Sequence, residues 1–464
     1  MTSTETPDSR ALSEAVDAGF PAAVADLSAL VRIPSIAWDG FDHSTVRASA
    51  EAVAELARGL GVFDLVEVRQ STVGDTDVMG QPAVIARRAA RNGKPTVLMY
   101  AHHDVQPVGD GAGWESSPFE PTLRGDRLYG RGAADDKAGI LMHIAAIRSL
   151  VEVLGTDFDL GLALFIEGEE EFGSRSFARF LHDNQAELAA DVIIVGDSGN
   201  WDVDTPALTV GLRGAVAFKL TVSTLDHALH SGMFGGAVPD AMLATIRLLD
   251  SFWKADGSVA VEGMLEREAE TPPYDEQRLR EESGLPDGVS TIGSGSELSR
   301  LWNKPSITVT GIDAPTVQNA SNTLIPSVTV KVSARVAPGQ TAADAFAALE
   351  RHVRANAPFG ATIEIDDVDP GDAFLVDTTG WAATAAEDAM HEAWGTAPVE
   401  IGVGGSIPFI ADLVQLFPEA QILVTGVEDP DSRAHSPNES LHLPGFRRSI
   451  LTEALLLRKL EARA

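Results

Sequence analysis

Residues 96–104 read TVLMYAHHD, an apolar run that ends in two histidines and an aspartate. A second run at residues 160–171, LGLALFIEGEEE, ends in three consecutive glutamates. Apolar runs of this length, bounded by glycine or charged residues, are typical of buried strands. Because ligands of open α/β sheets sit beyond the carboxyl ends of the strands, we expect both polar ends to meet at one edge of a sheet.

Two further acidic segments would add carboxylates to that edge. The loop at residues 130–137 reads GRGAADDK and contains Asp135, and the expected strand at residues 191–196 leads into Asp197. Histidine and carboxylate side chains that converge at one point suit a divalent transition metal. Two histidines and four acids exceed the four ligands of a structural zinc and match two metals that share a carboxylate.

A paired metal site has a specific chemistry. The two metals polarise a carbonyl oxygen and lower the pKa of a water that bridges them. A carboxylate that is not a ligand can take the proton of this water and pass it to a leaving amine. The run at residues 169–171 could supply both a ligand and this base, because adjacent residues at a strand end can point in different directions. Residue chemistry alone does not assign particular side chains to particular metals.

Length and composition restrict the class of protein. The chain has 464 residues, of which 44% are hydrophobic and 22% are charged, as is typical of a soluble globular protein with two domains. Its formal net charge is -33 at pH 7, with 35 basic and 68 acidic residues. Such a charge repels phosphate backbones and anionic lipids, so we expect neither a nucleic-acid partner nor a membrane partner.

Cysteine is absent from the sequence, which excludes disulfides, thiolate zinc sites and a cysteine nucleophile. No apolar run approaches the ~18 residues of a membrane span. Residues 1–10 are polar and acidic, without the apolar segment of a secretory signal. We therefore expect a cytoplasmic protein whose metals are held by histidine and carboxylate side chains.

The order of the expected elements predicts two domains. Strands and helices alternate up to about residue 210, which favours the α/β class, with a mostly parallel sheet and helices on both faces. The pattern then changes to antiparallel strands with two helices on one face, as in a smaller α+β, ferredoxin-like domain. We expect one domain at residues 1–211 and 373–464, interrupted by the second at residues 212–372.

The sequence resembles the co-catalytic di-zinc metallopeptidases of the carnosinase, aminoacylase and glutamate carboxypeptidase clan, and is most similar to their dipeptidase branch. Seven segments carry the resemblance, in the family order and across nearly the whole chain: residues 102–107, 114–121, 130–137, 167–174, 230–236, 404–408 and 435–439. The resemblance implies a catalytic di-metal domain, interrupted by a lid and dimerisation domain. It also implies two divalent metal ions, with zinc favoured and manganese or cobalt as alternatives.

The resemblance assigns metal ligands at matching positions. His102, Asp135 and Asp197 would bind one metal. Asp135, Glu171 and His435 would bind the second, so that Asp135 bridges the pair. These ligands come from segments more than 300 residues apart, and their convergence is therefore a strong expectation about the fold.

The resemblance also assigns the residues around the metals. Glu170 would act as the general base and acid. Asp104 would hydrogen-bond His102, fixing its tautomer and raising its basicity. The peptide bond between Asp135 and Asp136 is expected to be cis in this family.

The resemblance implies that four residues contact the substrate. His230 would stabilise the tetrahedral oxyanion by reaching across a homodimer, and Arg335 would grip the C-terminal carboxylate of the substrate as a bidentate fork. Thr323 and Ser406 would make further contacts with the substrate. One position departs from the pattern: many dipeptidase relatives carry arginine just before the Gly-Gly-Ser-Ile-Pro turn, where this chain has Gly402.

These expectations favour a metal-dependent hydrolase that cleaves the amide bond of dipeptides or short peptides with a metal-bridging water and a glutamate base. Within the same family, an N-acyl-amino-acid deacylase or a carboxypeptidase is the alternative. A non-catalytic peptide-binding relative is the alternative from another class. Such relatives usually lose a ligand or the base, and this chain retains both.

Overall fold

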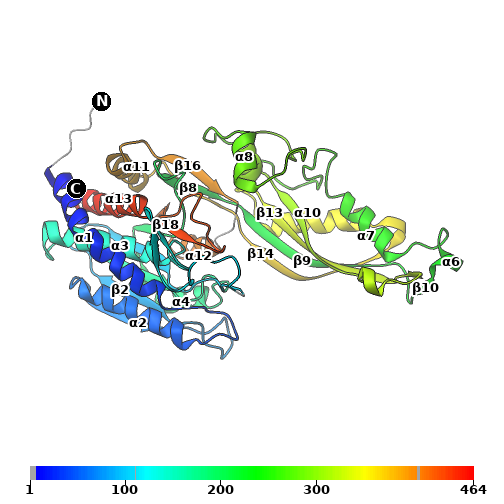
Figure 1. The fold of residues 1–464 in the computed structure, drawn as a ribbon, viewed down its shortest axis with the longest axis horizontal. Coiled ribbons are helices and arrows are strands. Elements are labelled where there is room, and N and C mark those ends of the chain that lie inside the picture. The colour runs from blue at the N-terminus through cyan, green and yellow to red at the C-terminus, as the bar shows by residue number, and fades with distance from the viewer. Residues whose placement is uncertain (1–6, 110, 405–407, 464) are drawn as a thin grey trace. The chain divides into compact units, whose positions relative to one another are not determined.

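The computed structural model describes residues 7–109, 111–404 and 408–463, and it divides into two compact units (Figure 1). Unit 1 extends to Val210 and includes Val376–Ile401 and the chain from Asp412 onward. Unit 2 comprises Gly211–Leu375 and Gly402–Ala411. Segment 402–411 thus groups with the interrupting unit, whereas we expected it in the catalytic domain. The roles of the two units stay predictions.

Unit 1 is built on a six-stranded sheet with the order β1-β2-β6-β3-β7-β17. Strand β3 pairs in parallel with β6 and β7, and β17 is parallel to β7, whereas β1 and β2 pair in antiparallel fashion. The expected mostly parallel sheet is therefore confirmed. Its elements are α1 (Pro7–Val31), α2 (Ser44–Gly59), β1 (Leu65–Arg69), β2 (Ala83–Arg88), β3 (Thr96–His102), β4 (Thr122–Arg124), β5 (Arg127–Tyr129), α3 (Lys137–Leu154), β6 (Gly161–Glu167), α4 (Phe177–Asp183), α5 (Gln185–Leu188), β7 (Val192–Val195), α11 (Trp381–Trp394), β17 (Gln421–Val424), β18 (Ser440–His442) and α13 (Leu443–Ala462).

Helices cover both faces of this sheet, as expected. Every residue of β3 is buried, and successive side chains point to opposite faces. Met99 belongs to the core cluster that includes Ile144 of α3. The ring of Tyr100, on the other face, packs edge-on against Phe177 of α4. Burial on both faces explains why this strand reads as a continuous apolar run rather than as an alternating one.

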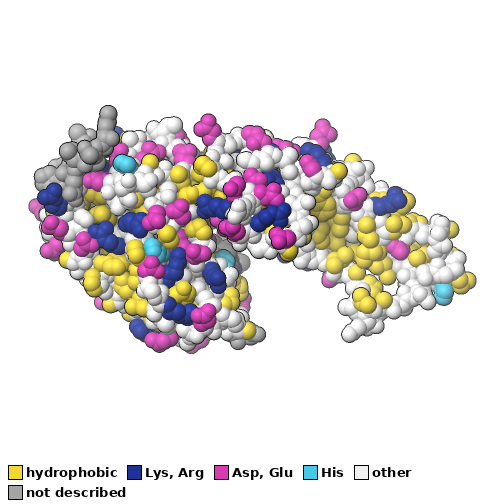
Figure 2. Space-filling model, turned by 45° about the horizontal axis from the view of Figure 1, so that its top comes forward, with side chains coloured by type: hydrophobic (Ala, Val, Ile, Leu, Met, Phe, Trp, Pro, Cys, Tyr) yellow, Lys and Arg dark blue, Asp and Glu magenta, His cyan; other side chains and the backbone are white. Residues whose placement is uncertain are grey.

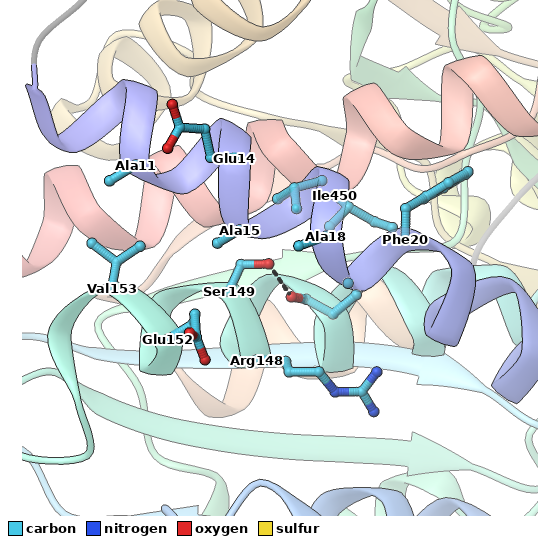
Figure 3. A pocket seen from close by; sticks show the side chains of 13 residues that line it. Ala11, Glu14, Ala15, Ala18, Phe20, Arg148, Ser149, Glu152, Val153 and Ile450 are labelled. Atoms are coloured by element: carbon cyan, nitrogen blue, oxygen red, sulfur yellow. Dashed lines mark hydrogen bonds between the residues drawn. The ribbon is translucent and has the colours of Figure 1, made fainter.

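Helices α1, α3 and α13 pack side by side in unit 1, and a hollow opens between them (Figure 3). Small residues of α1, such as Ala15 and Ala18, line it, and Ser149 of α3 donates its hydroxyl to the carbonyl oxygen of Ala145 at 2.9 Å. No residue of this hollow belongs to the site expected from the sequence. The residues expected to bind metal instead lie in other parts of unit 1, several of them at the ends of its strands.

Unit 2 contains a four-stranded antiparallel sheet with the order β11-β13-β9-β14. Alternate residues of β9 and β13 are buried in one cluster with residues of α7 and α10, so two helices cover one face, as expected. Its elements are β9 (Gly214–Ser223), β10 (Leu229–His230), α6 (Ser231–Phe234), α7 (Ala241–Asp250), α8 (Glu276–Ser283), α9 (Glu297–Trp302), β11 (Ser306–Asp313), the 3-10 helix η1 (Val317–Asn319), β12 (Thr323–Leu324), β13 (Ser327–Val336), α10 (Ala342–Ala355), the 3-10 helix η2 (Pro358–Gly360), β14 (Thr362–Gly371) and β15 (Phe374–Leu375). Three elements cross a boundary between the units: β8 (Ala207–Leu212), β16 (Val399–Val403) and α12 (Pro408–Leu416).

Within the described part of the chain, no helix combines the length and apolar character that crossing a membrane requires. Acidic side chains are scattered over the face drawn in Figure 2 and do not form a single patch.

Candidate metal centre

The polar ends of the unit 1 strands meet at one edge of the sheet. In the parallel pairing of β3 with β6, His102 lies beside Glu167 in the register. Both strands therefore end at the same level. Glu170 follows Glu167 by three residues, so it lies at the same edge of the sheet as His102. Strand β7 ends at Val195, two residues before Asp197. The strand order explains why these segments, distant in sequence, deliver their side chains to one place.

Six side chains at this edge could hold metal ions, and they form two groups of three. Within each group, the ligand atoms lie within 4.8 Å of one another. The groups are His102, Asp136 and Asp197, and Asp135, Glu171 and His435. One oxygen of Asp135 (Oδ1) is 3.1 Å from Nε2 of His102, and the other (Oδ2) is 3.0 Å from Nε2 of His435. The Asp135 carboxylate thus lies between the two imidazoles, where a shared ligand would sit.

Glu171 and Asp197 lie beside the two imidazoles. Nε2 of His435 is 3.2 Å from Oε2 of Glu171, and Nε2 of His102 is 3.9 Å from Oδ1 of Asp197. All five residues expected to be metal ligands are therefore gathered at this edge.

Asp136 was not among the residues expected at the site. It is buried, and its Oδ2 accepts a hydrogen bond from the backbone N–H of His102 at 3.1 Å. Its carboxylate thus helps to fix His102 and also lies within reach of a metal there. The only sequence signal was its position next to Asp135. The peptide bond between these two aspartates is cis, as expected.

Asp104 organises the glutamates that follow β6. Its two carboxylate oxygens accept hydrogen bonds from the backbone N–H groups of Glu170 and Glu171, both at 3.1 Å. Nδ1 of His102 lies 3.1 Å from the backbone oxygen of Asp104 and 3.4 Å from its Oδ1. The expected contact between Asp104 and His102 is therefore present, and it is accompanied by two bonds that the sequence did not suggest.

Glu170 lies at the edge of the cluster without joining either ligand group. Its Oε2 is 4.0 Å from Nε2 of His102, and its side chain is 19% exposed. Burial is the main cause that raises the pKa of Glu170. The nearby charge of His102 lowers this pKa, whereas the charge of Asp197 raises it further. A carboxylate in this position is free to accept and return a proton.

The loop after β17 places His435 in the cluster through an unusual backbone. His435 has a φ of 62°, and two other residues of this loop, Arg433 and Asn438, have φ values of 55° and 62°. Each left-handed residue of this kind costs roughly 1–2 kcal/mol. Conformations of this type persist where the surrounding structure enforces them and are frequent at functional sites.

Glu439 is a second residue that the sequence did not single out. Its buried carboxylate accepts hydrogen bonds from the backbone N–H groups of Gly132, Ala134 and Asp135, at 3.1, 3.0 and 3.1 Å. It also forms an ion pair with the buried Arg131 at 2.7 Å. Glu439 therefore ties the His435 loop to the loop that carries Asp135. Its membership of the segment 435–439 was the available signal.

The charges of this cluster fit bound cations. Burial raises the pKa of Asp197 to about 6 and that of Glu171 to about 7. Burial, and then the charge of Asp135, also raises the pKa of Glu428, a further acid beside the cluster. Hydrogen bonds to Asp135 and Glu171 raise the pKa of His435 to about 11. The carboxylates outnumber the imidazoles that could offset them, and divalent cations would relieve this repulsion.

Three of the residues expected to bind substrate, His230, Thr323 and Arg335, lie in unit 2, and they do not all come together within one chain. His230, which is exposed, pairs directly with Thr323 in the β10–β12 ladder. Arg335 lies near the far end of β13, which begins at Ser327 shortly after Thr323. At ~3.3 Å per residue, these eight steps span about 26 Å. Ser406 lies outside the described residues.

Comparisons with known proteins show the family to which the chain belongs. The model of Peptidase family M20/M25/M40 matches residues 98–459. A cysteinylglycine-S-conjugate dipeptidase from Corynebacterium striatum is 35% identical over 412 residues, which are 88% of this chain and 89% of the relative. A Cys-Gly metallodipeptidase from Schizosaccharomyces pombe is 28% identical over 464 residues, with 95% of each chain covered.

A solved structure supports the fold. The di-peptidase Dug1p from Saccharomyces cerevisiae superposes with a TM-score of 0.80 at 22% identity, covering 98% of this chain and 99% of that one. The likeness in fold thus extends over nearly the whole chain. The chain belongs to Peptidase family M20/M25/M40 and is a metallopeptidase.

Proposed function

We propose that this metallopeptidase is a dipeptidase that hydrolyses the amide bond of dipeptides and short peptides, with Glu170 as the general base and acid. The observation that carries the proposal is the position of Asp135 between His102 and His435, with Glu170 beside His102 and in neither ligand group. The activities of the relatives, which include Cys-Gly dipeptidases, point to the same substrate class.

We assign the metal ligands as the resemblance implies. His102, Asp135 and Asp197 would hold one cation, and Asp135, Glu171 and His435 would hold the other. Two zinc ions suit imidazole and carboxylate donors, and manganese or cobalt would also be accepted. When bound, the cations would polarise the scissile carbonyl and make the attacking water more acidic.

The protein groups would then move one proton. The carboxylate of Glu170 accepts a proton from the attacking water while the water oxygen bonds to the carbonyl carbon. The same carboxylate later donates this proton to the amide nitrogen as the C–N bond breaks, so one group serves both steps. Asp104 contributes by holding the backbone of Glu170 and Glu171, which keeps one glutamate as base and the next as ligand.

Unit 2 would complete the site as a lid and dimerisation domain. Arg335 would bind the C-terminal carboxylate of the substrate, and Ser406 would make a further contact. His230, with Thr323 beside it, would stabilise the oxyanion from a second copy of the chain. The separation of His230 from Arg335 along the sheet supports a homodimer. The cytoplasmic location stays a prediction.

A substitution of Glu170 tests the mechanism directly. Glu170→Gln should keep bound zinc at the wild-type level and lower kcat for dipeptides by about 10²–10⁴-fold, because the amide cannot carry the proton. Activity and metal content would be measured on the same preparation, with the exposed Glu419→Gln as the matched control. Wild-type turnover in Glu170→Gln would remove this residue from the mechanism.

A substrate panel separates the proposal from its alternatives. Dipeptides, N-acyl amino acids and longer peptides would be compared with and without a metal chelator. The account predicts chelator-sensitive hydrolysis that is fastest with dipeptides. Preference for acylated amino acids, or for residues at the C-terminus of long peptides, would instead identify a deacylase or a carboxypeptidase.

A further inference from the structure

Gln106 lies beside the candidate metal centre and has no role in the proposed proton transfer. It follows the end of β3 by four residues and is half-buried. Its amide Nε2 donates a hydrogen bond to Oε2 of Glu171 at 2.6 Å. A neutral amide is not among the donors that zinc prefers, so Gln106 is a partner of a ligand and not a ligand itself.

The segment that carries Gln106 continues the alternation of β3. Residues 103–108 form neither helix nor strand. Even so, His102 belongs to the cluster, Asp104 accepts the backbone N–H of Glu171, and Gln106 donates to the side chain of Glu171. Alternate side chains of an extended chain point the same way. This segment therefore directs every second residue to the metal centre.

Two constraints fix the backbone of this segment. The hydroxyl of Ser35 donates to the backbone oxygen of His103 at 2.6 Å, and the N–H of Val105 donates to the backbone oxygen of Ser35 at 3.0 Å. Pro107 follows Gln106, and the residue before a proline is confined to extended conformations. The amide of Gln106 is therefore presented from a rigid support.

Glu171 is held at its backbone and at its side chain by the same segment. Its N–H donates to Oδ2 of Asp104 at 3.1 Å, and its Oε2 accepts the bond from Gln106. The side chain of Glu171 is 3% exposed, so water does not readily replace the amide. Nε2 of His435 lies 3.2 Å from the same oxygen. Gln106 thus holds the carboxylate where it faces the other ligand of its group.

The chemistry of an amide suits this task. A protonated lysine or arginine could also donate to Glu171, but its charge would offset that of the carboxylate and repel a cation. An ionised carboxylate has about four lone-pair positions, so one bond from Gln106 leaves others for a cation. The amide therefore orients the carboxylate and preserves its negative charge.

We propose that Gln106 is a positioning residue, which orients Glu171 and thereby sets the affinity for the cation held by Asp135, Glu171 and His435. This inference rests on the proposed di-metal function. Loss of a hydrogen-bond partner of a metal ligand typically lowers metal affinity by about 10–100-fold. The effect should fall on one cation of the pair, because Glu171 is assigned to that cation alone.

Removal of the donor tests the inference through metal affinity. Gln106→Met keeps the length of the side chain and loses the N–H groups. In competition with a chelator, the variant should bind one zinc ion with wild-type affinity and the other about 10–100-fold more weakly. The zinc concentration for half-maximal hydrolysis of Ala-Gly should rise by the same factor. At saturating zinc, kcat should recover, because Glu170 and both ligand groups are then in place.

Cobalt gives a readout that does not depend on turnover. The visible absorption of cobalt(II) depends on the ligands and the geometry around the ion. When metal-free protein is titrated with cobalt(II), Gln106→Met should give the wild-type spectrum for the tightly bound ion and an altered spectrum for the other.

Two further variants complete the experiment. Gln277 on α8 also donates its amide to a glutamate, Oε1 of Glu281 at 2.9 Å, but on the surface. Gln277→Met is therefore the matched control and should retain both affinities and both spectra. Gln106→Asn keeps an amide but shortens the side chain by one methylene, so its N–H no longer reaches Glu171. It should show the same selective loss, and it carries the test if thermal unfolding shows that Gln106→Met is misfolded.

The contrary outcomes are equally defined. Wild-type affinity for both cations in both Gln106 variants would overturn the inference, without affecting the dipeptidase function. If Gln106 only fills space, metal-free Gln106→Met will be less stable and both cations will be weakened alike, which also overturns it. Failure of the wild type to bind two cations, or to hydrolyse any dipeptide when they are bound, would instead refute the proposed function.

Discussion

At the residue scale, Glu439 holds the candidate metal centre together through contacts with backbone and not with substrate. Its carboxylate accepts three backbone N–H groups of the loop that carries Asp135 and pairs with Arg131. The loop and Glu439 are more than 300 residues apart in the chain. The position of the Asp135 carboxylate therefore depends on a contact between two distant segments.

Replacing Glu439 should weaken both stability and metal binding. In Glu439→Gln, the amide NH2 group would face the backbone N–H donors that the carboxylate now accepts. Arg131 would also stay buried without a counter-charge, so the free energy of unfolding should fall by roughly 3–5 kcal/mol. Zinc affinity, measured by chelator competition, should fall by about 10–100-fold because Asp135 loses its support. The control is Glu115→Gln, whose partner Arg124 lies on the surface and whose effect should stay below about 1 kcal/mol. Equal behaviour of the two variants would refute this role for Glu439.

The residue scale is also where sequence reasoning was weakest. His102 and the glutamates after β6 were predictable because apolar strands lead directly into them. Asp136 and Glu439 were not, because they act on backbone N–H groups brought close only by folding. The periodicity of apolar residues along the sequence does not predict contacts between a side chain and a distant backbone N–H group.

At the scale of elements, α3 and α13 are joined by a buried pair. Nδ1 of His143 on α3 lies 2.9 and 2.8 Å from the two carboxylate oxygens of Glu453 on α13, and its Nε2 lies 3.0 Å from the backbone oxygen of Tyr100. Both ring nitrogens thus face acceptors, which favours the imidazolium. Burial opposes this charge, but the Glu453 carboxylate outweighs it and raises the pKa of His143.

This pair predicts a dependence of stability on pH. A histidine whose pKa is raised by folding stabilises the protein fully below its unfolded pKa, about 6.5, and the contribution disappears as pH rises through the folded value. The free energy of unfolding of the wild type should therefore exceed that of His143→Gln most at low pH, and the difference should narrow as the solution becomes alkaline. Urea unfolding at several pH values measures it. A difference that is constant or widens would contradict the assignment.

The elements themselves followed from the sequence more closely than the residues did. Strands β3 and β6 and helix α3 were predictable because burial on both faces requires continuous apolar runs. Unit 2 was recognisable from the alternation of apolar and polar residues in β9 and β13. Membership of segment 402–411 was not, because its contacts with Arg213 and Trp302 are tertiary.

At the scale of the whole molecule, the proposed homodimer predicts that two inactive variants restore activity when they are mixed. Glu170→Gln lacks the base and His230→Ala lacks the oxyanion donor. In a mixed dimer, one metal centre with an intact Glu170 would receive His230 from the other copy. After subunit exchange at equal concentrations, statistical pairing should return about a quarter of wild-type activity. Absence of any recovery from exchanged mixtures would show that His230 does not act across the interface.

The central claim is that side chains from position 102 to position 435 hold two cations that share the carboxylate of Asp135. Anomalous diffraction at the zinc edge, from crystals of the zinc-loaded protein, tests it most directly. The account predicts two peaks per chain, one on each side of the Asp135 carboxylate, next to His102 and His435 respectively. A single peak, or peaks that do not contact Asp135, would contradict it.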